Sequence, residues 1–207
     1  CKQRRIPQSG GGSVGTHMDY KFLQVKALEG AEPIIEEVGK EYKEIFGSEH
    51  VGFLETYQCE DADIILLTMG ILSPYLRFAV NANRAKGIKI GVVKLRVIRP
   101  FPERALTEAV KNAKVVIVVE RNPRNAIFTE LQAALYNNLV MEQKGKVYPL
   151  VIGKVVGIGG TEVSFTDITQ IIDEGLKAIE TGTCKPGVQW LGAKEINYDP
   201  LRDYSGD

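Results

Sequence analysis

The stretch that decides the fold is DIILLTM at residues 63–69, which Gly70 follows. Its apolar residues follow one another without the alternation expected of a strand that has one face in water. Such a run is typical of a strand buried on both faces of a sheet. Gly70 suits a turn, and Ser73 with Pro74 suits the N-cap and first position of a helix. The stretch therefore predicts a buried strand that leads directly into a helix.

The same strand–helix unit recurs further along the chain. The run at 115–119 consists entirely of β-branched residues, which favour a strand. Alternating apolar strands and amphipathic helices predict an α/β domain at 57–183, with a mostly parallel sheet covered by helices and right-handed crossovers. The expected strands are 63–69, 88–97, 115–119 and 147–156, and the expected helices are 73–86, around 106–113, 128–141 and 166–181.

The N-terminal residues 1–24 predict a linker or arm, because they are rich in Gly and Ser and show no periodicity. The sequence SGGGS at 9–13 suits an interdomain joint. The sequence GTHM at 15–18 also fits a cloning remnant, so whether residues 1–18 are native stays open.

Two further segments flank the α/β domain. Residues 25–56 predict a helical connector, in which Pro33 marks either a kink or the first turn of a second helix. Residues 184–207 lack a helical period but carry several large apolar side chains. They predict an extended arm that packs either on its own domain or on another domain or subunit.

Composition narrows the class of function. The 207 residues include 26 Lys and Arg and 26 Asp and Glu, so no basic excess indicates a nucleic-acid partner. No apolar run reaches the roughly 18 residues of a membrane-spanning helix, and we expect no membrane partner. The three cysteines, Cys1, Cys59 and Cys184, are far apart and form no CxxC pair. This spacing predicts neither a metal site nor an iron–sulfur cluster on the chain, and reduced thiols suit a cytoplasmic location.

Charged residues gather at the ends of two predicted strands. Arg96 and Arg99 end the strand at 88–97, and Glu120 with Arg121 follows the run at 115–119. Open α/β sheets bind ligands at this edge, and arginine is suited to carboxylate and phosphate groups. The cluster predicts either a site border or an ion-pair network that fixes loops or an interface.

The sequence GIGG at 157–160 follows the last predicted strand. Its backbone amides, including those of Gly159 and Gly160, suit either a tight turn or contact with an anion. The spacing matches neither the dinucleotide nor the P-loop motif. No Ser–His–Asp set, carboxylate pair or HExxH motif is present, so we predict no catalytic residue and no metal ligand on this chain.

Several ordered motifs resemble those in the C-terminal domain of the α-subunit of pyruvate:ferredoxin oxidoreductases. The helical segment at 25–46 is similar to that family's connector, and the broader class is the swivel domain of transketolases and of the pyruvate dehydrogenase β-subunit. The motifs are YQCEDADII at 57–65 with Met69-Gly70, GIKIGVV at 87–93 leading to RPFP at 99–102, VVER at 118–121, and GIGG at 157–160.

The resemblance implies a role in oxidative decarboxylation of a 2-oxoacid on thiamine diphosphate with Mg²⁺. Electrons would leave through [4Fe-4S] clusters to ferredoxin, with coenzyme A as acyl acceptor. No thiamine or cluster motif occurs here, so these cofactors are expected on other segments, and the isolated segment is expected to be inactive. Its roles would be assembly with other subunits and bordering the site. The residues in question are Arg96, Arg99, Glu120, Arg121, Gly159 and Gly160.

Some questions stay open at this stage. The family often has Arg-Asp after the paired glycines, where this chain has Thr161-Glu162. The 2-oxoacid can be pyruvate, 2-oxoglutarate, a branched-chain oxoacid or oxalate, and the use of coenzyme A and the subunit composition are not determined. Two alternatives are a swivel domain of a transketolase-like or 2-oxoacid dehydrogenase enzyme, and a stand-alone module that binds anions or nucleotides.

Overall fold

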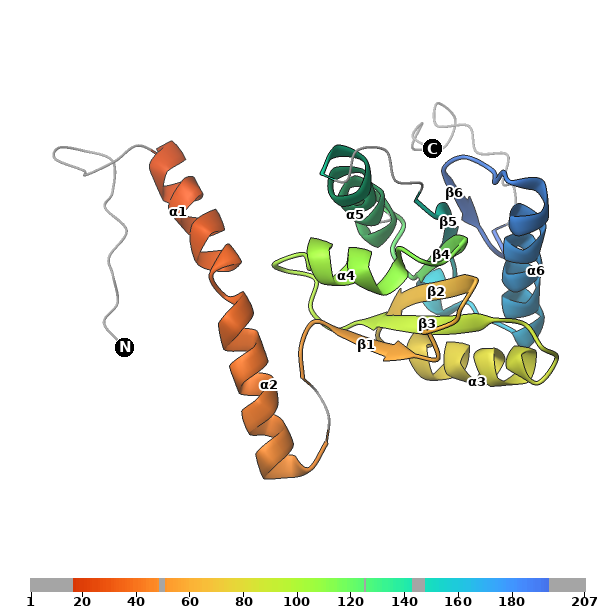
Figure 1. Cartoon of the computed structure of the whole chain (residues 1–207), viewed down its shortest axis with the longest axis horizontal. Helices are drawn as coiled ribbons and strands as arrows, with labels where there is room; N and C mark the ends of the chain where they lie inside the picture. Colours follow the sequence, from red (N-terminus) through yellow and green to blue (C-terminus); the bar gives the residue numbers. More distant parts are fainter. Residues whose placement is uncertain (1–16, 49–50, 125, 143–147, 194–207) are drawn as a thin grey trace, which may run out of the picture. The chain divides into compact units, whose positions relative to one another are not determined.

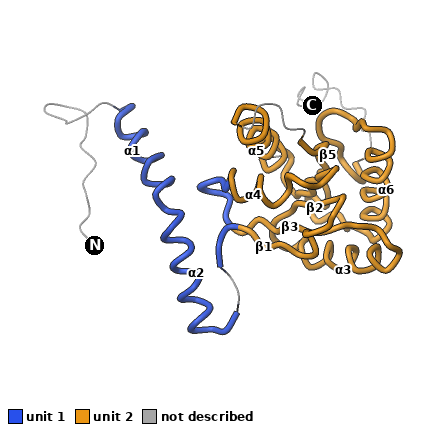
Figure 2. The backbone as a smooth tube through the Cα atoms, in the orientation of Figure 1, with its two compact units in different colours: residues 1–53, 97–102 blue, residues 54–96, 103–207 orange. Residues whose placement is uncertain are grey.

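The computed structural model in Figure 1 describes residues 17–48, 51–124, 126–142 and 148–193. The chain divides into two compact units, coloured separately in Figure 2. The first unit, residues 1–53 and 97–102, contains the helices α1 (His17–Glu29) and α2 (Glu32–Phe46). The second unit, residues 54–96 and 103–207, contains every strand of the sheet that is described below.

The sheet of the second unit has six strands in the order β1-β3-β2-β4-β5-β6. The neighbours from β3 to β6 are parallel, and β1 is antiparallel to β3. The predicted, mostly parallel α/β sheet is therefore confirmed, with two short edge strands that the sequence analysis did not include. The strands are β1 (Leu54–Tyr57), β2 (Ile64–Met69), β3 (Ile90–Leu95), β4 (Val115–Glu120), β5 (Leu150–Val155) and β6 (Val188–Trp190).

Helices cover both faces of this sheet (Figure 1). The helices α3 and α6 lie on one face and contact each other, and α4 and α5 lie together on the other. The helix α5 continues into a π-helical segment at Tyr136–Met141. The bounds are α3 (Leu72–Arg84), α4 (Glu103–Val110), α5 (Ala126–Leu135) and α6 (Phe165–Thr181).

The core confirms that the central strands are buried on both faces. Five of the six residues of β2 and all six of β4 are buried. One face of the sheet packs Ile64 and Ile117 against α3 and α6 in a single apolar cluster. Helix α6 comes so close that a Cβ added to Gly175 would lie 2.8 Å from Cδ1 of Ile117. Residues 64–68 are therefore densely packed on both faces of the sheet.

The linker predicted for residues 1–24 is wrong from residue 17 onward. Helix α1 occupies His17–Glu29, where a linker was expected up to residue 24. None of its residues is buried, so it has no core-facing stripe whose periodicity the sequence analysis could detect. Pro33 lies in the first turn of α2, as one of the two interpretations predicted, and α2 ends at Gly47 with φ 70°. Residues 1–16 of the expected arm lie outside the described residues.

The C-terminal expectation also changes. The short strand β6 pairs in parallel with β5, with Val188 opposite Gly153 and Trp190 opposite Val155. This part of the expected extended arm therefore docks on its own domain as an edge strand, while residues 194–207 lie outside the described residues. Among the helices that the structure describes, none combines the length and apolar character needed to cross a membrane.

Candidate functional site

The carboxyl ends of the parallel strands lie at one edge of the sheet, where the sequence analysis placed its candidate residues. Strand β2 lies between β3 and β4, so the winding of the chain reverses between β2 and β4. Open α/β sheets bind ligands outside such a point. Here the buried Thr68 hydroxyl donates a 2.7 Å hydrogen bond to the Val119 carbonyl. This bond joins the two strands just beyond their last paired residues, Leu67 and Val118.

Glu120 ends β4 and acts as a structural acceptor. Its side chain is only 4% exposed, and its Oε1 accepts a 3.4 Å hydrogen bond from the Phe128 backbone N–H in the first turn of α5. Burial raises the pKa of Glu120, and the backbone N–H groups of Phe128 and Ile127 partly offset this rise. The carboxylate therefore satisfies N–H groups that the start of a helix leaves without intrahelical partners.

Arg121 joins the end of β4 to the loop that follows β5. Its Nε donates a 2.9 Å hydrogen bond to the Gly157 carbonyl, and the Val156 N–H donates to the Glu120 carbonyl at 3.0 Å. Gly157 has φ 63°, and a Cβ there would lie 2.9 Å from Arg121 Nε. The left-handed backbone conformation favours glycine, and a side chain at this position would also crowd Arg121. The VVER and GIGG motifs thus meet in space through a defined contact.

Gly159 and Gly160 lie in the same loop, in a 3₁₀ turn at Ile158–Gly160. Both have positive φ, 67° and 84°, and a Cβ at either position would meet no atom within 4 Å. The loop and residues 190–193 line an open cavity of about 200 Å³, with Ile158 and Trp190 on its wall. The GIGG sequence thus forms a tight turn in the structure, and the space around Gly159 and Gly160 is open.

The start of α6, just after this loop, is already capped by side chains. The Asp167 N–H donates to Ser164 Oγ at 3.1 Å, and the Ser164 N–H donates to Asp167 Oδ2 at 2.7 Å. This capping box places a carboxylate where an anionic ligand would have to sit. It argues against anion binding at this helix N-terminus. The cap is Ser164, and α6 begins at Phe165, one residue before the expected start at 166.

Arg96 belongs to a different cluster. It follows β3, and its Nη2 donates a 2.7 Å hydrogen bond to Glu55 Oε2 on β1. Arg77 also forms an ion pair with Glu55, and Lys94 Nζ lies 3.7 Å from the same carboxylate. Strand β2 separates β3 from β4, so this network fixes the β1–β3–α3 side of the sheet, away from Glu120. Arg96 thus takes part in an ion-pair network around Glu55 in the structure.

Arg99 lies in the other compact unit, where its Nη1 donates a 2.7 Å hydrogen bond to the Ile98 carbonyl. The structure thus brings Glu120 and Arg121 together with the glycine loop and assigns Arg96 elsewhere. Sequence reasoning missed Glu55, because its strand is short and only half-buried. It placed Trp190 in an extended, packed arm but did not connect it with the loop at 157–161, beside which Trp190 lies.

The described residues do not fit a metal or cluster site. No group of three His, Cys, Asp or Glu side chains within 17–48, 51–124, 126–142 and 148–193 is arranged to hold a metal ion. The thiol of Cys59 donates to the Val92 carbonyl at 3.3 Å, and burial raises its pKa. A [4Fe-4S] cluster needs four thiolates, and the whole sequence has three cysteines.

Residues 62–168 match a family model described as "Pyruvate:ferredoxin oxidoreductase core domain II". The chain belongs to this family. It is 36% identical over 175 residues to pyruvate synthase subunit PorA of Methanosarcina barkeri, covering 82% of this chain and 42% of the relative. It is 33% identical over 190 residues to ketoisovalerate oxidoreductase subunit VorA of Pyrococcus horikoshii, covering 88% and 46%.

This pyruvate:ferredoxin oxidoreductase family member therefore spans less than half the length of these relatives. Among solved structures, it is similar to a 2-oxoglutarate:ferredoxin oxidoreductase from Magnetococcus marinus with 2-oxoglutarate, coenzyme A and succinyl-CoA bound. The TM-score is 0.45 with 19% sequence identity, and the match covers 80% of this chain and 25% of the other. A split-gene transketolase matches with a TM-score of 0.44 and 18% identity, covering 63% and 44%.

Proposed function

We propose that this domain is part of a thiamine diphosphate-dependent 2-oxoacid:ferredoxin oxidoreductase complex. The complex would oxidatively decarboxylate a 2-oxoacid, transfer the acyl group to coenzyme A and pass electrons to ferredoxin. The observation that carries the proposal is the family match over residues 62–168, together with relatives named as pyruvate synthase and ketoisovalerate oxidoreductase subunits. We propose a cytoplasmic location, as for a complex with reduced thiols.

The contribution of this domain would be assembly and support rather than chemistry. The buried carboxylate of Glu120 is occupied by backbone N–H groups of α5, and Arg121 is fixed on the Gly157 carbonyl. Residues used in this way hold loops in place. We propose that thiamine diphosphate, Mg²⁺ and the [4Fe-4S] clusters are bound by other segments of the complex.

The loop side of the sheet edge would border the active site of the complex. Arg121, Gly159 and Gly160 are the residues that support this role, since they shape the exposed loop after β5. Arg96 would act in assembly by fixing the edge strand β1. We propose a bordering or interface role for Arg99 in the other unit.

Purification of the native protein under anaerobic conditions tests the proposal. The chain should copurify with polypeptides that carry thiamine diphosphate and iron–sulfur clusters, and the preparation should reduce viologen when a 2-oxoacid and coenzyme A are added. A chain that never copurifies with such polypeptides would contradict membership of the complex. Copurification with decarboxylation but without viologen reduction would instead favour a 2-oxoacid dehydrogenase.

A further inference from the structure

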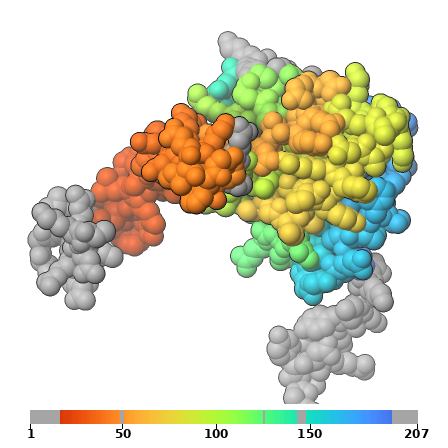
Figure 3. Space-filling model, turned by 90° about the horizontal axis from the view of Figure 1, so that it is seen from below, coloured from red at the N-terminus to blue at the C-terminus, as the bar shows by residue number. Residues whose placement is uncertain are grey.

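Helix α3 presents an apolar strip to solvent in the second unit. Ile71, at its start, is 73% exposed, and Phe78, two turns later, is 65% exposed. In Figure 3 the yellow atoms of the α3 region form much of the face toward the viewer, beside the blue atoms of α6. The exposed and half-buried residues on this side of the helix, called the α3 strip below, are Ile71, Pro74, Tyr75, Phe78, Asn81, Ala82 and Ala85. All are apolar or aromatic except Asn81, whose Oδ1 accepts hydrogen bonds from Tyr57 and Gln58.

The α3 strip carries no charged residue. The charged residues of α3 are Arg77 and Arg84. Arg77 pairs with Glu55, and Arg84 Nη2 lies 2.7 Å from Asp61 Oδ1. Both cations are thus engaged beside the strip.

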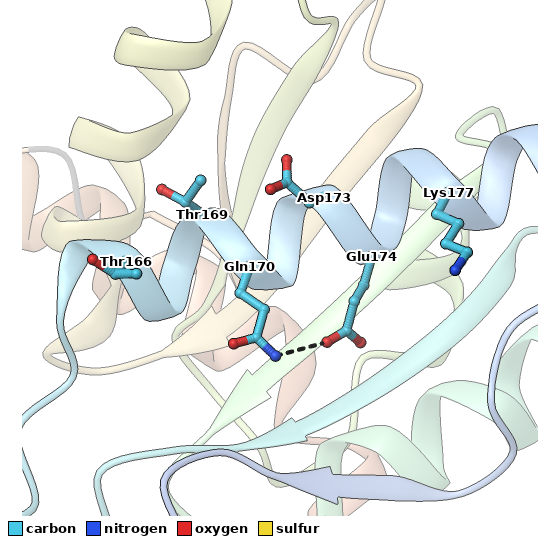
Figure 4. A pocket seen from close by; sticks show the side chains of 6 residues that line it. All are labelled: Thr166, Thr169, Gln170, Asp173, Glu174 and Lys177. Carbon is cyan, nitrogen blue, oxygen red and sulfur yellow. Dashed lines mark hydrogen bonds between the residues drawn. The ribbon is translucent and has the colours of Figure 1, made fainter.

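The neighbouring helix shows what an ordinary solvent face looks like here. Helix α6 lies on the same face of the sheet as α3 and contacts it. Figure 4 shows polar side chains along the outer side of α6, among them Thr166, Gln170 and Lys177. Surface helices normally expose such polar residues. The two adjacent helices therefore expose different kinds of side chain, polar ones on α6 and mainly apolar ones on the α3 strip. A second surface that covers the strip would remove these apolar side chains from water.

The apolar surface extends from α3 onto the start of α6. The ring of Phe165 packs edge-on against Phe78, with ring centroids 5.8 Å apart. Phe165 is 40% exposed, and Met69, before α3, is 38% exposed. At roughly 200 Å² for each large side chain, Ile71, Phe78, Phe165 and Met69 present on the order of 400 Å². This area lies within the range of the largest apolar patch on a typical monomer, about 300–600 Å², and such patches are often functional.

We infer that the α3 strip is a contact surface between two copies of this chain, packed about a two-fold axis with their α3 helices antiparallel. Because the strip has no charge, two copies can bury it without leaving an unpaired ion. Its N-terminal half is bulky, with Ile71 and Phe78, and its C-terminal half is small, with Ala82 and Ala85. An antiparallel pair sets the bulky half of each copy against the small half of the other, as an isologous interface requires.

The exposed apolar residues of α2 do not offer an equivalent surface to a second copy. Helix α2 contains five glutamates and two lysines, so two copies would bring net negative charge together.

The area of the α3 strip sets the expected strength of the contact. Two copies bury about 800 Å² from the four large side chains, with Pro74 and the small residues adding to this, whereas a standard interface buries about 1,200–2,000 Å². The contact is therefore weak in isolation.

Sedimentation equilibrium of the 207-residue chain, over about 1 µM to 1 mM, tests this inference. The expected result is a reversible dimer that Phe78→Asp weakens at least about tenfold, which corresponds to about 1.4 kcal/mol. Ile71→Asp should weaken it too, and aspartate is favoured at a helix N-terminus, so folding is preserved. Gln170→Asp, which adds the same charge on the outer side of α6 more than one turn away from Phe165, is the matched control and should leave the dimer unchanged.

Circular dichroism and thermal melting of each variant establish that it is folded. A monomer over the whole concentration range overturns the inference. So does a dimer that is equally strong in the wild type and in the folded Phe78→Asp and Ile71→Asp variants. A dimer weakened instead by Val38→Asp would assign the contact to α2 and also overturn it. None of these outcomes depends on the proposed enzymatic activity.

Discussion

Replacing Glu120 separates a structural role for this carboxylate from a chemical one. Glu120→Ala leaves the N–H groups at the start of α5 without their acceptor and opens a small cavity, since the side chain is 4% exposed. The hydrogen bond to Phe128 is long, at 3.4 Å, so its loss should cost about 1 kcal/mol, and the cavity adds about as much. We expect unfolding free energy to fall by about 2 kcal/mol. Glu120→Gln keeps an acceptor oxygen and should stay within about 1 kcal/mol of the wild type.

The raised pKa of Glu120 also makes the stability of the folded protein depend on pH. Burial raises the pKa of Glu120 in the folded state, so the folded protein binds a proton more tightly than the unfolded chain. The wild type therefore loses stability as pH rises through the unfolded pKa, about 4.3, toward the raised folded value. Glu120→Gln lacks this loss. Its stability relative to the wild type should increase from about pH 4 to pH 7.

Urea unfolding, followed by circular dichroism at several pH values, measures both effects. An Ala variant as stable as the wild type at neutral pH would refute the capping role. A Gln variant whose stability relative to the wild type falls with rising pH would refute the raised pKa. Loss of activity in an intact complex that carries the stable Gln variant would show that Glu120 takes part in chemistry.

Three further substitutions probe other contacts. Gly91→Ala would place a Cβ 2.5 Å from the Gln58 carbonyl oxygen, and should lower unfolding free energy by about 1–3 kcal/mol; an unchanged melting temperature would contradict this close approach. Glu55→Gln leaves three cations around a neutral group, so we expect the free energy of unfolding, measured with urea, to fall by about 1–2 kcal/mol. Added salt should reduce this difference, and a difference that is insensitive to salt would argue against its ionic origin. Arg99→Ala should impair assembly or acyl-acceptor kinetics more than melting temperature, and a lower melting temperature with unaltered assembly and kinetics would contradict its interface role.

The strands of the sheet core were predictable because burial on both faces leaves a direct mark on sequence. The runs that became β2 and β4 are apolar throughout their centres, and the structure places them in the middle of the sheet. Edge strands carry no such mark. Strand β1 is only half-buried, and β6 has three residues, so neither stands out from a loop. Helix α1 was missed for a related reason, since no residue of it is buried.

The candidate site could be predicted only in part. The sequence places Arg96 and Glu120 at the ends of strands, and both lie at the carboxyl edge as expected. It does not specify strand order, which puts β2 between them and sends Arg96 to Glu55 on an antiparallel neighbour. The contact between Arg121 and Gly157 joins residues that are distant in sequence. It needed the β4–β5 pairing before it could be inferred.

We propose that this domain supports a 2-oxoacid:ferredoxin oxidoreductase without carrying its chemistry. The most direct measurement is 2-oxoacid-dependent viologen reduction by the purified complex carrying Glu120→Gln and Arg121→Gln, with subunit composition and cofactor content determined for the same preparation. Side chains that only hold loops should leave kcat within about threefold of the wild type, well short of the factor of 10²–10⁴ that a catalytic acid or base contributes. A fall of about a hundredfold or more in an intact, fully loaded complex would contradict the claim.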